Sequence, residues 1–565
     1  QGGRRLLLRC LAYSGPWTFA CLHAEGNNFQ LPPGAEKIFE TPFNMPLTTE
    51  NIDTAFALLK NKGPFSFSKE AALALSEATG MLYGTAAMVL SGCAYHKVDA
   101  AQRKQLDASA DDINYGKNEL GWDAEDPAFL QRELHEVISK SLPEDLTELY
   151  TSPKTFAETL AAAWREKYGV RTPLDVQLIR KLEDDLRDPH PNFITQATAL
   201  VEADTSPQLN CDAVWAHRPW RGGYDGAELY FRSVPKGWPL PVTAQGDDLA
   251  KWPDTSACFS YEALYLHMKL IAWANLELEV GHPLREKAAL AASLIETRLA
   301  SQGMLLPVGT GSIKDAETFW NFVKELKGPP YRAPEGDSAE GIVAGGLVMV
   351  WPTEEKERNG VFLSLATGQL TDRETRQTLL KRIEAPDGGI QIPGADINAY
   401  PYWHNWRLWQ SDDFQSLIAE LKQTGLTTGA FVANPAVSAA DTLKTVQQKQ
   451  KLSTEAAMLY LQVSVLGEPS AKRVMRYNGW KKATYEKAAA ELVEKRLVVE
   501  KKYKTASHTL FLPGEVVYFD RYPAPVETAK LALLGLVEKE RPPFGVPLNL
   551  QSMREAYSRV SGKTK

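Results

Sequence analysis

The chain has few cysteines, and they carry no pairing or metal-binding pattern. Its 565 residues contain 5 cysteines, at positions 10, 21, 93, 211 and 258, and none forms a CxxC pair. Scattered cysteines in odd number argue against a disulfide framework and favour reduced thiols in a cytoplasmic setting. Cys93-Ala-Tyr-His96 has zinc-ligand chemistry, but no second pair follows at finger spacing. We therefore expect no metal site.

Catalytic motifs are also missing. The sequence has no GxxxxGK[ST] phosphate loop, and Gly309-Thr-Gly-Ser312 lacks the lysine of one. It has no GxSxG, HExxH or EF-hand pattern. No apolar run reaches the length of about 20 residues that a membrane-spanning helix needs. We expect a non-enzymatic protein without a cofactor, and the missing initiator methionine favours a piece of a longer chain.

Length predicts several domains, because 565 residues exceed what one hydrophobic core usually supports. The expected fold is mainly α with an α+β middle region. Residues 1–205 are predicted to be a mainly helical domain, since Thr155-Phe-Ala-Glu158 is a capping-box pattern and Thr172-Pro173 opens a second helix. Residues 107–150 hold 12 acidic and 3 basic side chains, which favours a solvated helical face over a docking surface for a basic partner.

Residues 206–440 are predicted to mix helices with strands. Helices are expected at about 260–279, 284–300, 316–327 and 411–424. The apolar runs Gly341 to Trp351 and Val361 to Ala366 are of β type, and Asn359-Gly360 between them favours a hairpin. A looser stretch from Ala433 to Thr442 would link this region to the next one.

Residues 450–515 have the element order of a winged helix-turn-helix, and 516–565 are expected to form a C-terminal helical tail. Gly467 and Pro469 separate the first two helices, and Asn478-Gly479 supplies left-handed turn residues before the third. The expected elements are a helix opened by Ser453, helices at 470–477 and about 480–495, and strands at 497–504 and 509–512 around a wing at 503–508.

Charge supports this interpretation. From Lys472 to His508 there are 11 Lys and Arg against 4 acidic residues, about +7, on a chain whose net charge is −7. Backbone phosphates supply much of the affinity of DNA-binding modules, so a basic segment on an acidic chain is typical of a phosphate-binding face.

The N-terminal end of the third helix meets the groove in such a fold. The side chains expected nearest the bases are Lys481, Lys482, Thr484 and Tyr485, and those nearest the phosphates are Lys502, Lys504 and His508. The wider set of candidate contacts adds Lys472, Arg473, Arg476 and Lys487. Two alternatives stay open: winged helices also dock proteins, and lysine-rich helices can be merely solvated.

Residues 215–225 and 400–409 combine aromatic rings with arginines and are expected to be loops. Rings beside arginines can stack bases or hold a ligand. A tryptophan-rich seam between domains is the favoured interpretation. A ligand site would use Trp215, His217, Arg218, Arg221, Asp225, His404 and Arg407. In an enzyme, the acid–base groups would be His217, Asp225 and His404.

Several stretches of the chain match a known pattern. They are Leu459-Tyr-Leu-Gln462, Arg476-Tyr-Asn-Gly-Trp480, Phe511-Leu-Pro-Gly514, Val526 to Leu534 and Met553 to Val560, with looser matches at Tyr83 to Leu90 and Leu160 to Trp164. Together they resemble the C-terminal portion of large bacterial proteins of the MolR family. The resemblance implies a winged helix, a longer parent chain, and association with MoxR-type ATPases and von Willebrand A-domain proteins.

These observations lead to a ranked expectation of function. The first is a cytoplasmic, multidomain DNA-binding regulator or adaptor in a larger bacterial assembly. The second is a protein-docking scaffold that works with a MoxR-type ATPase system. The third is an enzyme that uses the two aromatic-basic stretches.

Overall fold

A computed structural model describes residues 7–10, 18–21, 49–62, 68–90, 193–201, 261–300, 305–332, 339–352 and 359–563, and parts of 103–120 and 137–186. They form two compact units. The first unit holds the described residues up to Lys181 together with 193–198, and the second holds 182–186, 199–201 and the described residues from 261 onward. The predicted fold class, mainly helical with an α+β middle region, is confirmed.

The first unit is a helical cluster with one short hairpin. Its described elements are β1 (Leu7–Cys10), β2 (Thr18–Cys21), α1 (Thr49–Lys62), α2 (Lys69–Thr79), α3 (Tyr83–Leu90), α5 (Ala110–Leu120), α7 (Glu148–Thr151) and α8 (Pro153–Tyr168). Leu75, Met88, Leu160 and Trp164 are fully buried in its core. Helices α3 and α5 approach closely through glycines, since a Cβ on Gly84 would lie 1.7 Å from the carbonyl oxygen of Asp112.

Two predicted helix starts have different outcomes. The capping box predicted at Thr155 is wrong, because α8 already begins at Pro153 and Thr155 lies inside its first turn. The helix predicted after Pro173 is confirmed as α9 (Val176–Leu186), with Leu178, Leu182 and Leu186 buried. Helix α10 (Phe193–Val201) follows it.

The second unit contains a six-stranded antiparallel sheet with the order β4-β5-β6-β7-β3-β8. The strands are β3 (Leu305–Ile313), β4 (Pro330–Arg332), β5 (Ala339–Ala344), β6 (Leu347–Pro352), β7 (Gly360–Ala366) and β8 (Ala395–Ala399). The expected pairing of the two apolar runs is confirmed by β6 and β7. The first run is itself a hairpin, because Gly345 and Gly346 have positive φ and turn the chain between β5 and β6.

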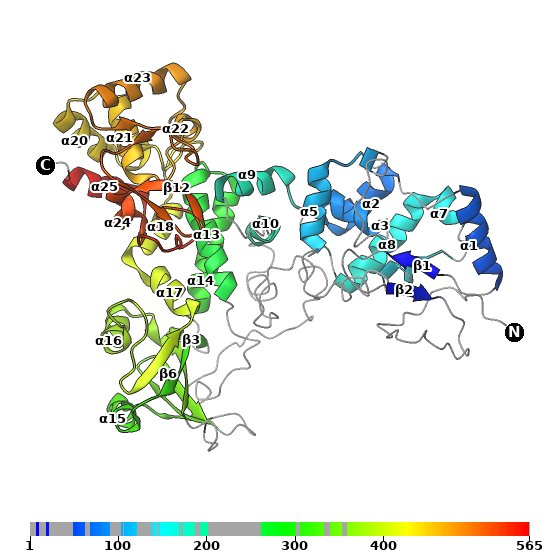
Figure 1. Ribbon diagram of the computed structural model, residues 1–565, viewed down its shortest axis with the longest axis horizontal. Helices are drawn as coiled ribbons and strands as arrows, with labels where there is room; N and C mark the ends of the chain where they lie inside the picture. Colours follow the sequence, from blue (N-terminus) through cyan, green and yellow to red (C-terminus); the bar gives the residue numbers. More distant parts are fainter. Residues whose placement is uncertain are drawn as a thin grey trace. The chain divides into compact units, whose positions relative to one another are not determined.

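Helices surround and extend this sheet. The four predicted helices are present as α13 (Tyr261–Glu277), α14 (Pro283–Leu299), α15 (Ala316–Leu326) and α18 (Asp412–Leu421), and the structure adds α16 (Arg373–Ile383) and α17 (Pro401–Gln410). Within this unit the sheet, α15 and α16 lie at one end, and α13, α14 and α17 lie between them and the C-terminal helices (Figure 1).

The C-terminal part of the unit runs from α19 to α25. Its elements are α19 (Pro435–Ser438), α20 (Ala440–Gln450), α21 (Thr454–Val465), α22 (Ala471–Asn478), α23 (Lys482–Glu494), β9 (Val499–Glu500), β10 (Leu510–Phe511), β11 (Val516–Phe519), β12 (Tyr522–Glu527), α24 (Leu531–Leu534) and α25 (Met553–Lys563). The carboxylate of Glu420 on α18 accepts hydrogen bonds from the backbone N–H groups of Met553 and Arg554, which anchors the start of α25.

Two expectations for this part are wrong. The stretch from Ala433 to Thr442 is no loose linker: Ala433 is fully buried, and its carbonyl accepts hydrogen bonds from Tyr557 and Gln462. Residues 516–565 are not purely a helical tail, because β11 and β12 pair as an antiparallel hairpin. The division into domains at 1–205, 206–440, 450–515 and 516–565 stays a prediction.

Among the described residues, no single helix is both long and apolar enough to span a membrane; the bent pair α2 and α3 passes that test only when taken together.

Candidate nucleic-acid interface

The helices predicted between Ser453 and Lys495 form close to their expected bounds. Ser453 caps α21 by accepting a hydrogen bond from the N–H of Ala456, and Ser470 caps α22 in the same way from Arg473. Gly479, at φ 65°, ends α22. The predicted strands at 497–504 and 509–512 shrink to the two-residue pair β9 and β10.

Helices α21 and α22 are locked at the corner before α23. The amides of Gln462 and Asn478 exchange two hydrogen bonds, of 2.8 and 3.1 Å. Gln462 also donates to the carbonyl of Ala433. The corner that presents α23 is therefore held by buried polar contacts as well as by its glycine.

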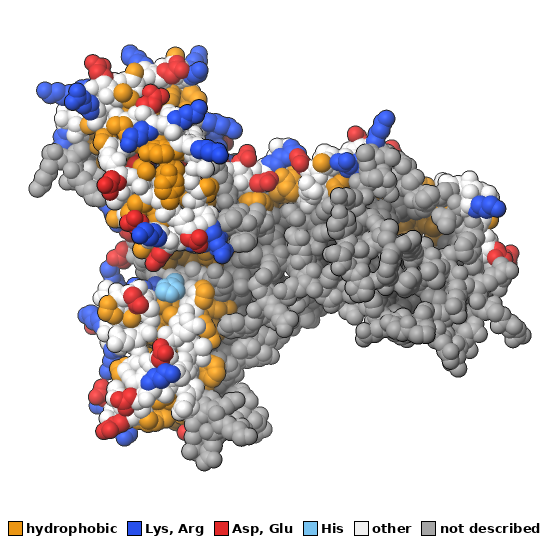
Figure 2. Space-filling model, viewed as in Figure 1, with side chains coloured by type: hydrophobic (Ala, Val, Ile, Leu, Met, Phe, Trp, Pro, Cys, Tyr) orange, Lys and Arg blue, Asp and Glu red, His pale blue; other side chains and the backbone are white. Residues whose placement is uncertain are grey.

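Every lysine of the segment from Lys472 to His508 is exposed. They are Lys472, Lys481, Lys482, Lys487, Lys495, Lys501, Lys502 and Lys504. Figure 2 shows Lys and Arg side chains over α22 and α23, with acidic side chains interspersed. One of these acids, Glu486, lies 3.5 Å from Lys482 in an exposed ion pair, which contributes little stability. The surface is therefore basic, but not uniformly so.

The start of α23 differs from the starts of α21 and α22. Its N-cap is Lys481, which makes no side-chain capping hydrogen bond. The backbone N–H groups of a helix's first turn carry a partial positive charge, to which Lys481 and Lys482 add two full charges. This end of α23 is the part of the segment best suited to lie near an anion.

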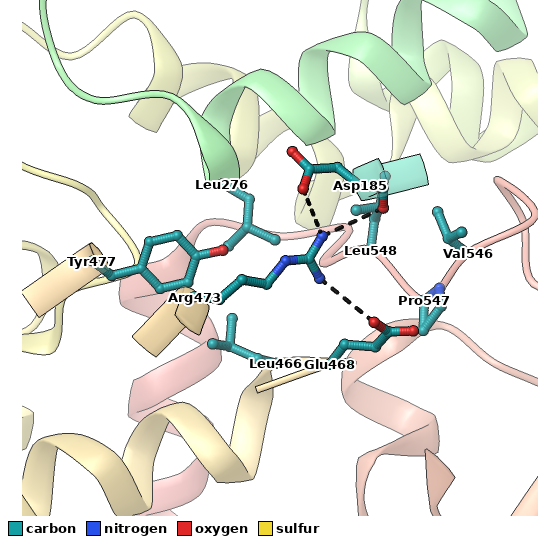
Figure 3. Close-up of a pocket in the computed structure, with 10 residues that line it drawn as sticks. Asp185, Leu276, Leu466, Glu468, Arg473, Tyr477, Val546, Pro547 and Leu548 are labelled. Carbon is teal, nitrogen blue, oxygen red and sulfur yellow. Dashed lines mark hydrogen bonds and ion pairs between the residues drawn. The ribbon is translucent and has the colours of Figure 1, made fainter. Parts of the chain in front are cut away.

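Arg473 does not belong to this exposed surface. Its side chain is 18% exposed and lies 3.2 Å from Asp185, 3.4 Å from Glu277 and 3.9 Å from Glu468. Burial alone would lower the pKa of Arg473, but Glu277 and the other anionic partners outweigh it and raise the pKa. Figure 3 shows the guanidinium group between Asp185 and Glu468. The prediction that Arg473 contacts a phosphate is therefore wrong.

Arg476 and Tyr477 share Glu277 with Arg473. Arg476 pairs with one oxygen of this fully buried carboxylate, and the Tyr477 hydroxyl donates to the other at 2.8 Å. The guanidinium group of Arg476 also lies 5.6 Å from the centre of the Phe431 ring. Arg476 is partly exposed, but its charge is already neutralised by Glu277. It is therefore a poor candidate for a phosphate contact.

Arg473, Asp185 and Glu468 line a small cavity. Its walls are formed by Asp185, Leu276, Leu466, Gly467, Glu468, Arg473, Tyr477, Val546, Pro547 and Leu548 (Figure 3). A volume of about 20 Å³ admits roughly one water molecule. The cluster therefore joins α22 to α13 and α9 and has no room for a ligand. The roles of Glu277 and Asp185 could not be predicted from local sequence patterns, because these residues lie about 200 and 290 positions before their arginine partners.

The sequence predicted that His508 lies near phosphates, but the structure buries it. Its ring is 5% exposed, packs at 4.4 Å from the ring of Phe511, and neither ring nitrogen has a hydrogen-bond partner among the described residues. Burial, aided by the nearby charge of Lys530, lowers the pKa of His508 to about 3. A neutral buried ring cannot contact a phosphate, so that expectation is wrong.

Thr484 and Tyr485 lie at the edge of the exposed surface. Both are half-buried in the first turns of α23. Burial raises the pKa of Tyr485 to about 12. The candidates that remain well exposed are Lys472, Lys481, Lys482, Lys487, Lys502 and Lys504.

The second aromatic-basic stretch is a helix, so the expected loop at 400–409 is wrong. Trp403, Trp406 and Trp409 of α17 are buried. Arg407 pairs with Glu384 and donates to the carbonyl of Gly388. Burial and the charge of Arg407 lower the pKa of His404. These contacts pack α17 within its own unit, and the interpretation of this stretch as a seam between domains stays a prediction.

The first aromatic-basic stretch, with Trp215, His217, Arg218, Arg221 and Asp225, lies outside the described residues, as does the Cys93–His96 pair. In the part of the chain that the structure does describe, no group of three or more His, Cys, Asp or Glu side chains is placed to hold a metal ion.

Comparison of the chain with protein-family models, with curated proteins and with solved structures finds no match.

Proposed function

We propose that this protein is a non-enzymatic DNA-binding protein. In this proposal α21, α22, α23 and the β9–β10 pair form a winged helix-turn-helix, with residues 501–509 as the wing. The observation that carries the proposal is the separation of the segment's cations: all its lysines are exposed, whereas Arg473 is 18% exposed and is paired with carboxylates.

Exposed lysines suit contacts with phosphates. A lysine ammonium group is a flexible point charge that needs no fixed geometry, and neutralising phosphates releases counterions. Lys481 and Lys482 stand at the uncapped end of α23, and Lys502 and Lys504 stand beyond β9. This distribution supports contact by the start of α23 in a groove and by the wing on the adjacent backbone.

The resemblance to MolR-like proteins extends the proposal to a biological setting. We infer a cytoplasmic regulator or adaptor in a bacterial assembly, with a MoxR-type ATPase or a von Willebrand A-domain protein as partner.

A second candidate function is protein docking by the C-terminal part of the same unit. It is supported by two exposed apolar side chains, Tyr518 on β11, 53% exposed, and Val537 after α24, 58% exposed. Exposed apolar side chains favour a protein partner over DNA. Recovery of a stoichiometric protein without nucleic acid in pull-downs would favour this candidate.

The test of DNA binding compares the full chain with a variant in which Lys481, Lys482, Lys502 and Lys504 are changed to Gln. For four phosphate contacts, affinity for a fluorescent random-sequence duplex should fall by about two decades between about 50 and 200 mM salt. The variant should bind more weakly and with a flatter salt dependence, by about 0.9 in logarithmic slope for each lost contact.

A matched control changes Lys314, Lys324, Lys381 and Arg382 to Gln. These four cations are exposed on the sheet-containing part of the same unit, so the change in net charge is identical. The control should bind as the parent does. Equal binding by the parent and by the variant that lacks Lys481, Lys482, Lys502 and Lys504 would show that this surface is not the contact.

A further inference from the structure

The outward residues of α23 lack the side chains that usually read bases. Arg pairs with guanine, and Asn or Gln with adenine, through paired hydrogen bonds in the major groove. The helix KATYEKAAAELVE contains none of these three residue types. Its exposed residues are Lys482, Ala483, Glu486, Lys487, Ala490, Val493 and Glu494.

The polar groups that remain near the start of α23 are poor base readers. Glu486 could accept a hydrogen bond from cytosine, but it lies 3.5 Å from Lys482. Thr484 is half-buried, and Tyr485 is also partly withdrawn from the surface. Lysine can contact guanine, but its flexible stem suits a phosphate equally well.

The arginines of the segment lie where they cannot contact base edges. Arg473 is held by Asp185, Glu277 and Glu468, and Arg476 by Glu277. Arg496 follows the far end of α23, and a helix of 13 residues is about 20 Å long. None of the three lies at the helix start that would enter a groove.

The wing and the strands on either side of it repeat the pattern. From Arg496 to Leu512 the sequence RLVVEKKYKTASHTLFL has no Asn or Gln. Its exposed cations after Arg496 are Lys501, Lys502 and Lys504. Both parts of the surface therefore present point charges with almost no fixed bidentate groups.

We propose that the surface formed by α23 and the wing holds duplex DNA by its phosphates and discriminates little between base sequences. This inference rests on the proposed DNA-binding function and adds the class of DNA to it. The physical reason is that affinity comes from charge neutralisation, whereas discrimination needs directional contacts to base edges.

The experiment is a selection with the full chain. A library of random duplexes, about two helical turns long, is equilibrated with the protein at about 50 mM salt; the bound fraction is recovered, amplified, reselected and sequenced. We expect no short motif to be enriched more than about threefold over the starting pool, because a single good base contact gives about fivefold discrimination or more.

Three outcomes are distinguishable. Flat enrichment with salt-sensitive binding supports the inference. A recovered motif that binds about fivefold or more tightly than the pool overturns the inference and leaves DNA binding intact. Failure to recover DNA above a no-protein control would overturn the DNA-binding function itself.

Single substitutions provide a second readout. Lys481→Gln and Lys502→Gln should each weaken binding to AT-rich and GC-rich duplexes by the same factor, and each should lower the salt slope by about 0.9. Lys324→Gln is the matched control and should change neither quantity. A shift in the AT-to-GC preference of Lys481→Gln would show that Lys481 reads bases, which also overturns the inference.

Discussion

At the scale of single residues, His508 is unusual because its polar ring is buried without a hydrogen-bond partner among the described residues. It lies beside Phe511 and near Lys530, which is itself fully buried and lies 2.9 Å from Glu527 and 3.0 Å from the carbonyl of Leu466. The ring has no described partner for either nitrogen. A positive charge there would be both desolvated and close to another cation, so the neutral ring is strongly preferred.

This preference predicts acid sensitivity. Because the folded-state pKa of His508 is about 3 and an unfolded histidine has a pKa of about 6.5, the unfolded state binds more protons between these values. The His508 contribution to stability is complete above about pH 6.5 and should fall by about 2 kcal/mol between pH 7 and pH 5. The measurement is thermal unfolding of the parent and of His508→Phe across this range.

The difference between the two proteins isolates His508, since their carboxylates titrate alike. As the pH falls from 7 to 5, the unfolding midpoint of the parent should fall steadily relative to that of His508→Phe. A gap that stays constant over this range would mean that the ring acquires a hydrogen-bond partner in solution.

At the scale of elements, α22 is attached to the rest of its unit through buried charge. Glu277, fully buried at the end of α13, receives Arg473, Arg476 and Tyr477 from α22. Asp185 adds a contact from α9 and also accepts a hydrogen bond from the indole of Trp273. This cluster sets where α22 lies, and thereby where α23 begins.

Removing Glu277 should therefore be costly. Glu277→Ala leaves two guanidinium groups short of their shared partner, and breaking a buried ion pair in this way costs about 3–5 kcal/mol. Urea unfolding followed by tryptophan fluorescence is the measurement. Glu486→Ala, which breaks the exposed pair with Lys482, is the control and should cost less than about 1 kcal/mol. Similar losses for the two variants would contradict a structural role for the buried cluster.

The hairpin between β5 and β6 offers a second test on elements. A Cβ added to Gly345, at φ 56°, would meet no atom within 4 Å, whereas a Cβ on Gly346, at φ 87°, would lie 2.4 Å from a methyl carbon of Leu370. Asn tolerates the left-handed region, so Gly345→Asn should cost less than about 1 kcal/mol. Gly346→Asn should cost at least about 2 kcal/mol, because it adds a clash in the core. Equal costs in urea unfolding would show that the turn rearranges.

At the scale of the whole molecule, the segment that we propose to bind DNA is no independent module. Gln462 donates to the carbonyl of Ala433, Asn549 donates to the carbonyl of Val465, and Tyr477 donates to Glu277. These bonds run to parts of the chain outside 453–513. Cutting the segment out would leave those groups unsatisfied and its apolar faces exposed.

We expect a fragment of residues 453–513 to be unfolded on its own. Residues 261–565, which keep all of these contacts except those of Asp185, should fold cooperatively. Circular dichroism during thermal unfolding distinguishes the two fragments. A cooperative transition for 453–513 would show that the module is autonomous.

Local patterns were sufficient to predict many elements of the second unit. Ser453, Ser470 and Gly479 act at short range, so the bounds of α21 and α22 follow from capping and turn chemistry. The helical spacing of apolar residues likewise predicted α13, α14, α15 and α18. The pattern failed at 400–409, where Pro401 starts a helix and the tryptophans face a core that only the fold supplies.

The sequence by itself determined which side chains could serve the candidate surface, but the tertiary structure decided which of them do. Eleven cations were equivalent in a charge count. The fold placed Arg473 among carboxylates that come from distant positions, and it buried the ring of His508 against Phe511. Helix starts and turns depend on neighbouring residues, whereas burial and charge pairing depend on what the folded chain brings alongside.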